Sequence, residues 1–331
     1  MLDPTQFITR TPLDSMAFQF INKAEDFVAM SVLPPKPIDA TQKKVYQYDT
    51  AMMKVVQTEG TSKSQAGKVD YGVFARNITT TLHKLGADVD PKDEVTFDRP
   101  VAAVRRNQAK NIWHRLMLSM EQAAITLVTT ASSYPSTLTS ALTTSTNRWI
   151  DAGGDPEADR ATAGIAVRNS SGKTVNAACM ARDSFDQLRT SPTFRERMKY
   201  TTGFQSDDGF MAAVKAMLGV QHLVLSNARY DSANDLITPV LGSMWDDSCL
   251  FFYHNPSPEL EDISFGHTYI RKELYSYEAI DPKRGGPDGR IVELEAGWEW
   301  VQASGYCVGD NLHTGTVDTD FAAGYLLRNI V

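Results

Sequence analysis

The strongest pattern along the chain is a long stretch in which apolar residues recur at helical spacing. Between Asp98 and Ala131 an apolar stripe repeats every three, four or eight residues, and it comprises Val101, Val104, Ile112, Leu116, Met120, Ala124 and Leu127. This spacing places the side chains on one side of an α-helix. Asp98 suits the N-cap and Pro100 the first turn. At 1.5 Å per residue the helix would be about 50 Å long, so we expect another layer to pack along it.

Two short β-patterns precede this helix and enclose a polar segment. Val45–Tyr48 and Val69–Phe74 combine β-branched and aromatic residues, whereas Glu59–Lys68 between them is small and polar. The pattern predicts a two-stranded hairpin with a flexible tip. An isolated two-stranded hairpin is only marginally stable in water, so we expect either the body of the subunit or another chain to cover it.

The segment before the hairpin has a large apolar content. Ser15–Val32 predicts a short amphipathic helix that contains Phe18, Phe20 and Phe27. These side chains must bury against their own domain or against a neighbour. Leu33–Pro37 then ends the helix, because proline lacks an N–H donor and favours extended geometry in the preceding residue.

The chain after the long helix alternates between helical and strand patterns. Ser136–Asn147 predicts a loop, and Asp155 and Pro156 then begin a helix that ends near Asn169. Beyond it we expect, in order, a strand, three helices and two strands: Val175–Met180, Ala181–Leu188, Pro192–Met198, Asp207–Leu218, Val220–Leu225 and Trp245–Tyr253. This order indicates the α+β fold class.

The last part of the chain predicts a second long hairpin. Tyr269–Ile280 and Ile291–Gln302 are β-patterns on either side of the glycine-rich turn Gly285–Gly289. In the second pattern Glu293 alternates with apolar neighbours, so one face should point outward. The apolar segment Phe321–Leu327 is expected to dock against the body.

The composition is that of an ordinary folded protein with a mild acidic excess. The 331 residues include 33 Lys and Arg and 40 Asp and Glu, which gives a net charge of −7. This balance disfavours a general nucleic-acid coating role, which needs clustered basic charge. No apolar run approaches the roughly 20 residues that cross a bilayer, so we expect no membrane partner. Cys179, Cys249 and Cys307 lack a C-x-x-C pair and predict free thiols in a reducing compartment.

The sequence lacks the common motifs that indicate a catalytic site. There is no dinucleotide-binding glycine motif, P-loop, G-x-S-x-G or H-E-x-x-H, and the six histidines lack metal-ligand spacing. The most suggestive group is Trp245–Asp247 followed by His254. It is either an acid–base pair or, as we favour, a turn that leads into a strand. We therefore expect no enzyme activity, no cofactor and no metal.

The order of these parts resembles the major capsid proteins of tailed bacteriophages, the Hong Kong 97-like or Johnson fold. The resemblance covers nearly the whole chain and rests on Asn22–Ala29 with Leu33–Ile38, Asp155–Pro156, Thr174–Leu188, Pro192–Tyr200, Leu218–Val220 and Phe265–Tyr269. It implies an N-terminal arm (1–40), an extended β-hairpin loop (41–78) and a peripheral domain (79–135 and 268–304) with its spine helix at 98–131. It also implies an axial domain (136–267 and 305–331).

The resemblance further implies a structural role without chemistry. The chain would assemble into hexamers and pentamers of an icosahedral head shell around the double-stranded DNA of a tailed phage. It would act in the virion, after assembly in the host bacterial cytoplasm. Its partners would be its own copies, a separate scaffolding protein, a portal and a decoration protein. An encapsulin-like shell around protein cargo is the alternative with the same fold, and an unrecognised soluble enzyme is a weaker one.

Two sets of contact residues follow from the arm, the loop and the long helix. The candidate subunit contacts are Phe18, Phe20, Phe27, Val45, Tyr46, Tyr48, Lys63, Lys68, Tyr71 and Phe74. Some family members cross-link neighbours through Lys–Asn bonds, but solvated lysines are the commoner explanation for Lys63 and Lys68. The basic face of the long helix is usually only solvated. Weak, non-specific contacts with packaged DNA at the inner surface would use Arg105, Arg106, Lys110 and Arg115.

Overall fold

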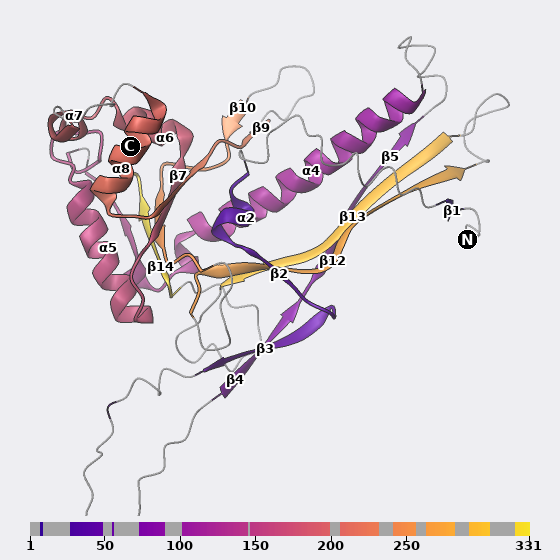
Figure 1. The fold of residues 1–331 in the computed structure, drawn as a ribbon, viewed down its shortest axis with the longest axis horizontal. Helices are drawn as coiled ribbons and strands as arrows, with labels where there is room; N and C mark the ends of the chain where they lie inside the picture. The colour runs from indigo at the N-terminus through magenta and orange to yellow at the C-terminus, as the bar shows by residue number, and fades with distance from the viewer. Residues whose placement is uncertain are drawn as a thin grey trace, which may run out of the picture.

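The computed structural model describes residues 7–8, 27–48, 55, 73–89, 101–144, 146–198, 206–231, 241–255, 263–281, 291–304 and 322–331. Figure 1 shows three parts: a helix-covered sheet at one end, an elongated sheet with a long helix along it at the other, and a narrow hairpin that projects from the body. Mixed helix and sheet content agrees with the predicted α+β class. None of the described helices combines the length and apolar character needed to span a bilayer.

The helix-covered sheet has five strands with mixed directions. Its spatial order is β6 (Thr139–Ala141), β14 (Gly324–Arg328), β11 (Cys249–Phe252), β7 (Ala177–Ala181) and β8 (His222–Ser226). The central strand β11 is antiparallel to both of its neighbours, whereas β7 with β8 and β14 with β6 are parallel. Every residue of β7 and β11 is buried, which is why both strands are continuous apolar runs in the sequence.

Four helices surround this sheet, and their ends follow local sequence signals. They are α5 (Pro156–Ser171), α6 (Arg182–Leu188), α7 (Pro192–Met198) and α8 (Asp207–Leu218). The Asp155 side chain accepts hydrogen bonds from the N–H groups of Glu157 and Ala158, so the predicted helix start is confirmed. Helix α8 is capped in the same way by Ser206 and ends at Gly219, which has a φ of 57°.

The long helix α4 (Val101–Thr129) lies along the elongated sheet. That sheet has the order β1 (Phe7–Ile8), β12 (Gly266–Asp281), β13 (Ile291–Ser304) and β5 (Thr81–Val89), and these neighbours pair antiparallel. The short strand β2 (Pro35–Pro37) joins the same sheet and pairs parallel with β12. Ile112, Trp113 and Leu116 of α4 bury against Leu294 and Ala296 of β13. The predicted long helix is confirmed over its described length, whereas its predicted start at 98–100 lies outside the described residues.

The late hairpin and the docked C-terminal segment are also present. β12 and β13 pair antiparallel from Gly266 opposite Ser304 to Asp281 opposite Ile291, and the predicted turn between them lies outside the described residues. β14 inserts between β6 and β11, so the expected docking of the apolar end is confirmed.

Several expected boundaries are wrong. The predicted strand Trp245–Tyr253 is limited to β11, because Trp245–Ser248 forms a turn whose polar groups satisfy one another. Within the described part of the predicted N-terminal helix, only α2 (Ala29–Val32) is helical. The loop predicted at 136–147 contains the short strand β6, and β5 had no prediction at all.

Candidate assembly surfaces

The projecting hairpin consists of β3 (Gln42–Tyr48) and β4 (Val73–Thr79). The strands pair antiparallel, with Gln42 opposite Thr79 and Tyr48 opposite Val73. Figure 1 shows them leaving the body, and among the described strands neither pairs with any other. Tyr46 is 51% exposed although it is a large aromatic residue. The hairpin therefore offers both free backbone edges and apolar area to a partner.

The predicted subunit contacts of the hairpin and the arm, apart from Phe27, fall into three groups. Tyr46 is exposed, as a subunit contact requires, whereas Val45 is half-buried against the cluster of Ile38, Ile78, Tyr269 and Ala303 in its own chain. Tyr48 and Phe74 lie on the paired strands by register. Phe18, Phe20, Lys63, Lys68 and Tyr71 lie outside the described residues.

The base of the hairpin is fixed by a buried carboxylate on β13. Glu299 Oε1 accepts a hydrogen bond of 2.7 Å from the Thr80 hydroxyl, and Oε2 accepts one of 2.8 Å from Arg271 Nη1. The Thr80 N–H donates to the Thr41 carbonyl at 2.9 Å and so closes the hairpin. We call Thr41, Thr80 and Glu299 the hairpin root.

Phe27, one of the predicted subunit contacts, is covered by its own chain. Its side chain is only 8% exposed, and its ring meets His114 of α4 edge-on at a centroid distance of 6.1 Å. A residue covered by its own chain has little area left for a neighbour. The sequence showed an apolar residue at helical spacing but could not show which surface covers it, and that surface is the subunit's own long helix.

The segment that follows Phe27 is fixed by a second buried carboxylate. Glu121 of α4 is 0% exposed. Its two oxygens accept hydrogen bonds from the N–H groups of Val28 and Ala29 at 2.9 and 2.8 Å. These are donors at the start of α2 that the helix itself leaves unpaired. We call Phe27–Val32 the arm root.

A second exposed ribbon was not predicted from the sequence. It consists of β9 (Arg229–Asp231) and β10 (Leu241–Ser243), which pair only with each other among the described strands. Leu241 is 69% exposed and Tyr230 is 38% exposed. Such short strands give too weak a hydrophobic pattern for detection, although exposed apolar residues on a ribbon suit a subunit contact.

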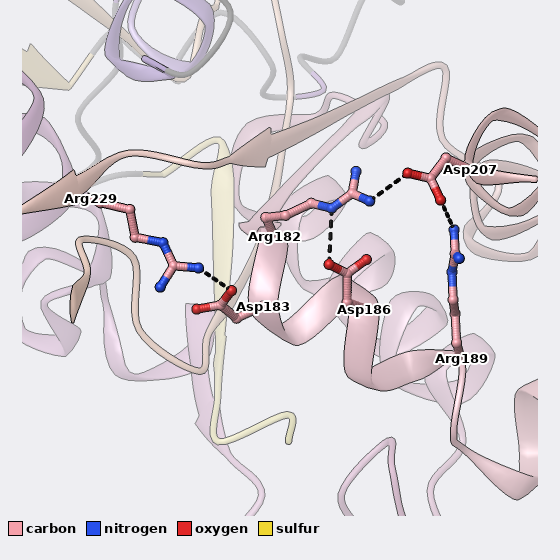
Figure 2. A network of polar contacts seen from close by, with 6 residues as sticks. All are labelled: Arg182, Asp183, Asp186, Arg189, Asp207 and Arg229. Carbon is pink, nitrogen blue, oxygen red and sulfur yellow. Dashed lines mark hydrogen bonds and ion pairs between the residues drawn. The ribbon is translucent and has the colours of Figure 1, made fainter. Parts of the chain in front are cut away.

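Ion pairs tie this ribbon and two helices together. Figure 2 shows Arg182 of α6 between Asp186 and Asp207, with Arg189 also reaching Asp207 at the start of α8. Arg229 of β9 pairs with Asp183. The hydrogen bonds from Arg182 and Arg189 lower the pKa of Asp207. Three arginines and three aspartates neutralise one another here, so this surface offers a partner no strong net charge.

The outer strand β5 carries further exposed apolar residues. Leu82 is 48% exposed and Leu85 is 38% exposed, and among the described strands β5 pairs only with β13. Lys84 approaches Glu295 at 3.8 Å and adds charge to the edge. Natural edge strands often use such charges to resist unwanted pairing.

The basic residues predicted to touch DNA all lie on α4. Arg106 and Arg115 are exposed, whereas Arg105 and Lys110 are half-buried. The buried side of the helix faces β13 and β5, as its apolar contacts show. A DNA contact through this face stays a prediction.

The group Trp245–Asp247 with His254 does not form an acid–base pair. The Asp246 carboxylate accepts the Ser248 hydroxyl hydrogen, and Trp245 Nε1 donates to the Ser248 carbonyl at 2.9 Å. The ring centroids of His254 and His222 lie 5.4 Å apart. Burial and, to a lesser extent, the charge of His222 lower the pKa of His254. In the described part of the chain, no group of three His, Cys, Asp or Glu side chains is placed to hold a metal ion.

No protein-family model matches the sequence, and no curated protein matches it. Solved structures do match. The chain is similar over 98% of both lengths to a phage-related protein from Bordetella bronchiseptica RB50, with 18% identity and a TM-score of 0.69. It is also similar to the capsid structure of cyanophage P-SCSP1u, with 11% identity, a TM-score of 0.54 and coverage of 94% of this chain and 90% of that one.

A third similar structure is a virus-like particle from Pyrococcus furiosus. It has 11% identity, a TM-score of 0.51 and coverage of 96% of this chain and 98% of that one. At such identities the likeness establishes the fold alone. The chain has the fold of phage capsid proteins, as the order of its sequence elements predicted.

Proposed function

We propose that the chain is a major capsid protein that builds the icosahedral head shell of a tailed phage around double-stranded DNA. The observation that carries the proposal is the fold, which the chain shares over 94% of its length with the capsid of cyanophage P-SCSP1u. In this proposal the copies first close into hexamers and pentamers in the host cytoplasm. A separate scaffolding protein, a portal and a decoration protein are the other partners, and the mature chain resides in the virion.

The physical basis of assembly is that the projecting parts gain cover from neighbouring copies. Tyr46 on the hairpin and Leu241 on the ribbon leave apolar area in water in a single copy. A specific interface buries roughly 800 Å² per partner, and several modest interfaces add up in a closed ring. Because assembly removes folded subunits from the free pool, it shifts the equilibrium by mass action.

The charge of the chain suits a container more than a DNA-binding coat. The net charge is −7, which does not favour strong binding of the packaged duplex. A strongly basic lining would hold the duplex through counterion release and hinder its movement. The four basic residues of α4 would then make only weak, salt-sensitive contacts.

A shell around protein cargo, as in encapsulins, is the second candidate. The observation that favours it is the likeness to the virus-like particle from Pyrococcus furiosus. The contents of purified particles separate the two functions. Nuclease-protected double-stranded DNA supports the phage head, whereas a co-purifying enzyme supports the compartment. Neighbouring genes for portal, terminase and scaffold would also support the phage head.

The test of assembly is expression of the chain, alone and with its neighbouring scaffold gene, followed by negative-stain imaging. The matched variant replaces Gln42–Arg76 with a short Gly-Ser linker. Thr41 and Ile78 stay in place, so the hairpin root and the four buried residues of the Ile78 cluster are retained, and only the half-buried Val45 is lost from that cluster. We expect closed shells from the parent and a soluble, folded protein without shells from the variant. Normal shells from the variant would contradict the proposed role of the hairpin.

A further inference from the structure

Two buried carboxylates hold the arm root and the hairpin root, and their surroundings differ in one respect. Glu121 at the arm root is 0% exposed, and Glu299 at the hairpin root is 6% exposed. Glu299 has a cationic partner, since Arg271 Nη1 lies 2.8 Å from its Oε2. Among the described residues no cation forms an ion pair with Glu121, which has only the two N–H groups of Val28 and Ala29.

This difference determines which protonation state each root favours. Burial penalises the charged form of a carboxylic acid, and a nearby cation or a set of donors favours it. For Glu121 two neutral N–H donors oppose the penalty. For Glu299 the Thr80 hydroxyl and the full charge of Arg271 oppose it. Full burial without a cation therefore leaves the Glu121 carboxylate less well supported than the Glu299 carboxylate, which has Arg271 beside it.

We propose that Glu121 and Glu299 are positioning residues for assembly, that Glu121 fixes the arm root and Glu299 the hairpin root, and that acid strengthens the arm root while it weakens the hairpin root. The consequence for shells rests on the proposed function, whereas the local effect on each root does not. Between mildly acidic and alkaline pH, the arm root should loosen as the pH rises. The hairpin root should stay closed over that range and open only in acid.

The pKa shifts agree with the geometry in sign. Burial raises the pKa of Glu121 from its usual 4.5 to about 7, against the lowering effect of the Val28 and Ala29 N–H groups. For Glu299 burial also acts to raise the pKa, but hydrogen bonds from Thr80, Arg271 and Thr41 and the charge of Arg271 outweigh it, so the pKa is lowered. Linkage then requires that closure of the arm root weakens as the pH rises through 7, and that closure of the hairpin root weakens as the pH falls below the usual value.

Other titratable groups around Glu121 do not reverse this sign. Cys179 of β7 interacts with the Glu121 carboxylate, and burial holds the pKa of that thiol well above its ordinary value. It thus stays neutral over the range considered. His114 contacts Phe27 at the arm root, and burial together with Arg115 lowers its pKa. Gln302 of β13 donates to the Met120 carbonyl at 3.2 Å and does not titrate.

The first test measures hydrogen–deuterium exchange of the arm root in the full chain. We expect residues 27–33, corrected for the intrinsic exchange rate, to be about tenfold better protected at about pH 6 than at about pH 8.5. Glu121→Gln keeps one acceptor and cannot ionise, so its protection should not change with pH. Glu196→Gln, an exposed residue of α7, is the matched control and should behave like the parent.

The second test measures the hairpin root at neutral pH. Glu299→Gln should lower the protection of residues 78–82, and Thr80→Val should lower it less because the Arg271 pair remains. In the parent, the same residues should lose protection at about pH 4 relative to pH 7, which is opposite in sign to the arm root. Exchange in β7 and β11 reports whether the body stays folded. If a variant unfolds the body, the pH dependence of exchange in the parent serves as the test instead.

The outcomes separate the inference from the proposed function. If shells form but both roots respond to pH in the same direction, or Glu121→Gln keeps the pH dependence of the parent, the inference is wrong. If the roots respond in opposite directions but no shells form under any condition, the inference holds for the subunit and the proposed function fails.

Discussion

The helix-covered sheet and the projecting hairpin are both β-structures, but only the sheet is complete in one copy of the chain. All residues of β7 and β11 are buried, and Phe251 of β11 contacts Trp149 with ring centroids 6.2 Å apart. The hairpin has two strands, no further partner among the described strands, and an aromatic residue half in water. Substitutions in the sheet should therefore act on folding, and substitutions in the hairpin should act on association.

The largest effect on the free energy of unfolding should come from Phe251→Ala. Phe251 is 0% exposed between β14 and β7, and removing a buried aromatic side chain typically costs about 3–5 kcal/mol. Urea denaturation of the non-assembled subunit measures the change. A loss below about 1 kcal/mol would show that this sheet is not the stable body of the molecule.

Phe27→Asp should have the next largest effect, and it tests the expectation that Phe27 is a contact between subunits. The substitution places a charge beneath α4 beside His114, and we expect a loss of about 2–3 kcal/mol in the subunit itself. Phe27→Leu is the matched control, because it keeps most of the apolar volume. If Phe27→Asp leaves urea denaturation unchanged but blocks shell formation, the Phe27 side chain makes a contact between subunits.

Tyr46→Ser should have the smallest effect on folding and a large effect on assembly. Tyr46 is 51% exposed, and surface substitutions usually change stability by less than about 0.5 kcal/mol. Tyr46→Phe keeps the ring and should assemble like the parent. Sedimentation velocity measures the fraction of subunits in particles. If Tyr46→Ser and the parent assemble to the same extent, Tyr46 is not a contact between subunits.

Much of the fold could be predicted because its signals are local. The stripe of α4, the Asp155 cap of α5 and the apolar run of β11 each depend on residues close together in the sequence. The pairing of β14 between β6 and β11 could not be predicted, because it joins segments that are far apart in the sequence and carry no local signal for each other. The strand β5 was missed because its side chains are largely exposed and give no clear alternation.

The candidate site was less predictable than the fold. Tyr46 could be singled out because an aromatic residue in a two-stranded pattern needs cover, and its exposure agrees with that prediction. Glu121 was missed, although one signal was available: it lies one turn before Ile125 and directly after Met120, within the buried side of the helix. Glu299 lies in a strand pattern whose glutamates we expected to point outward, and the approach of Thr80 and Arg271 explains its burial.

The most direct measurement of the central claim is cryo-electron microscopy of the chain expressed with its neighbouring scaffold gene. The account predicts closed icosahedral particles in which β3 and β4 of one copy lie against an adjacent copy and Tyr46 is covered. A stable single copy at high concentration, with this hairpin packed on its own body, would contradict it.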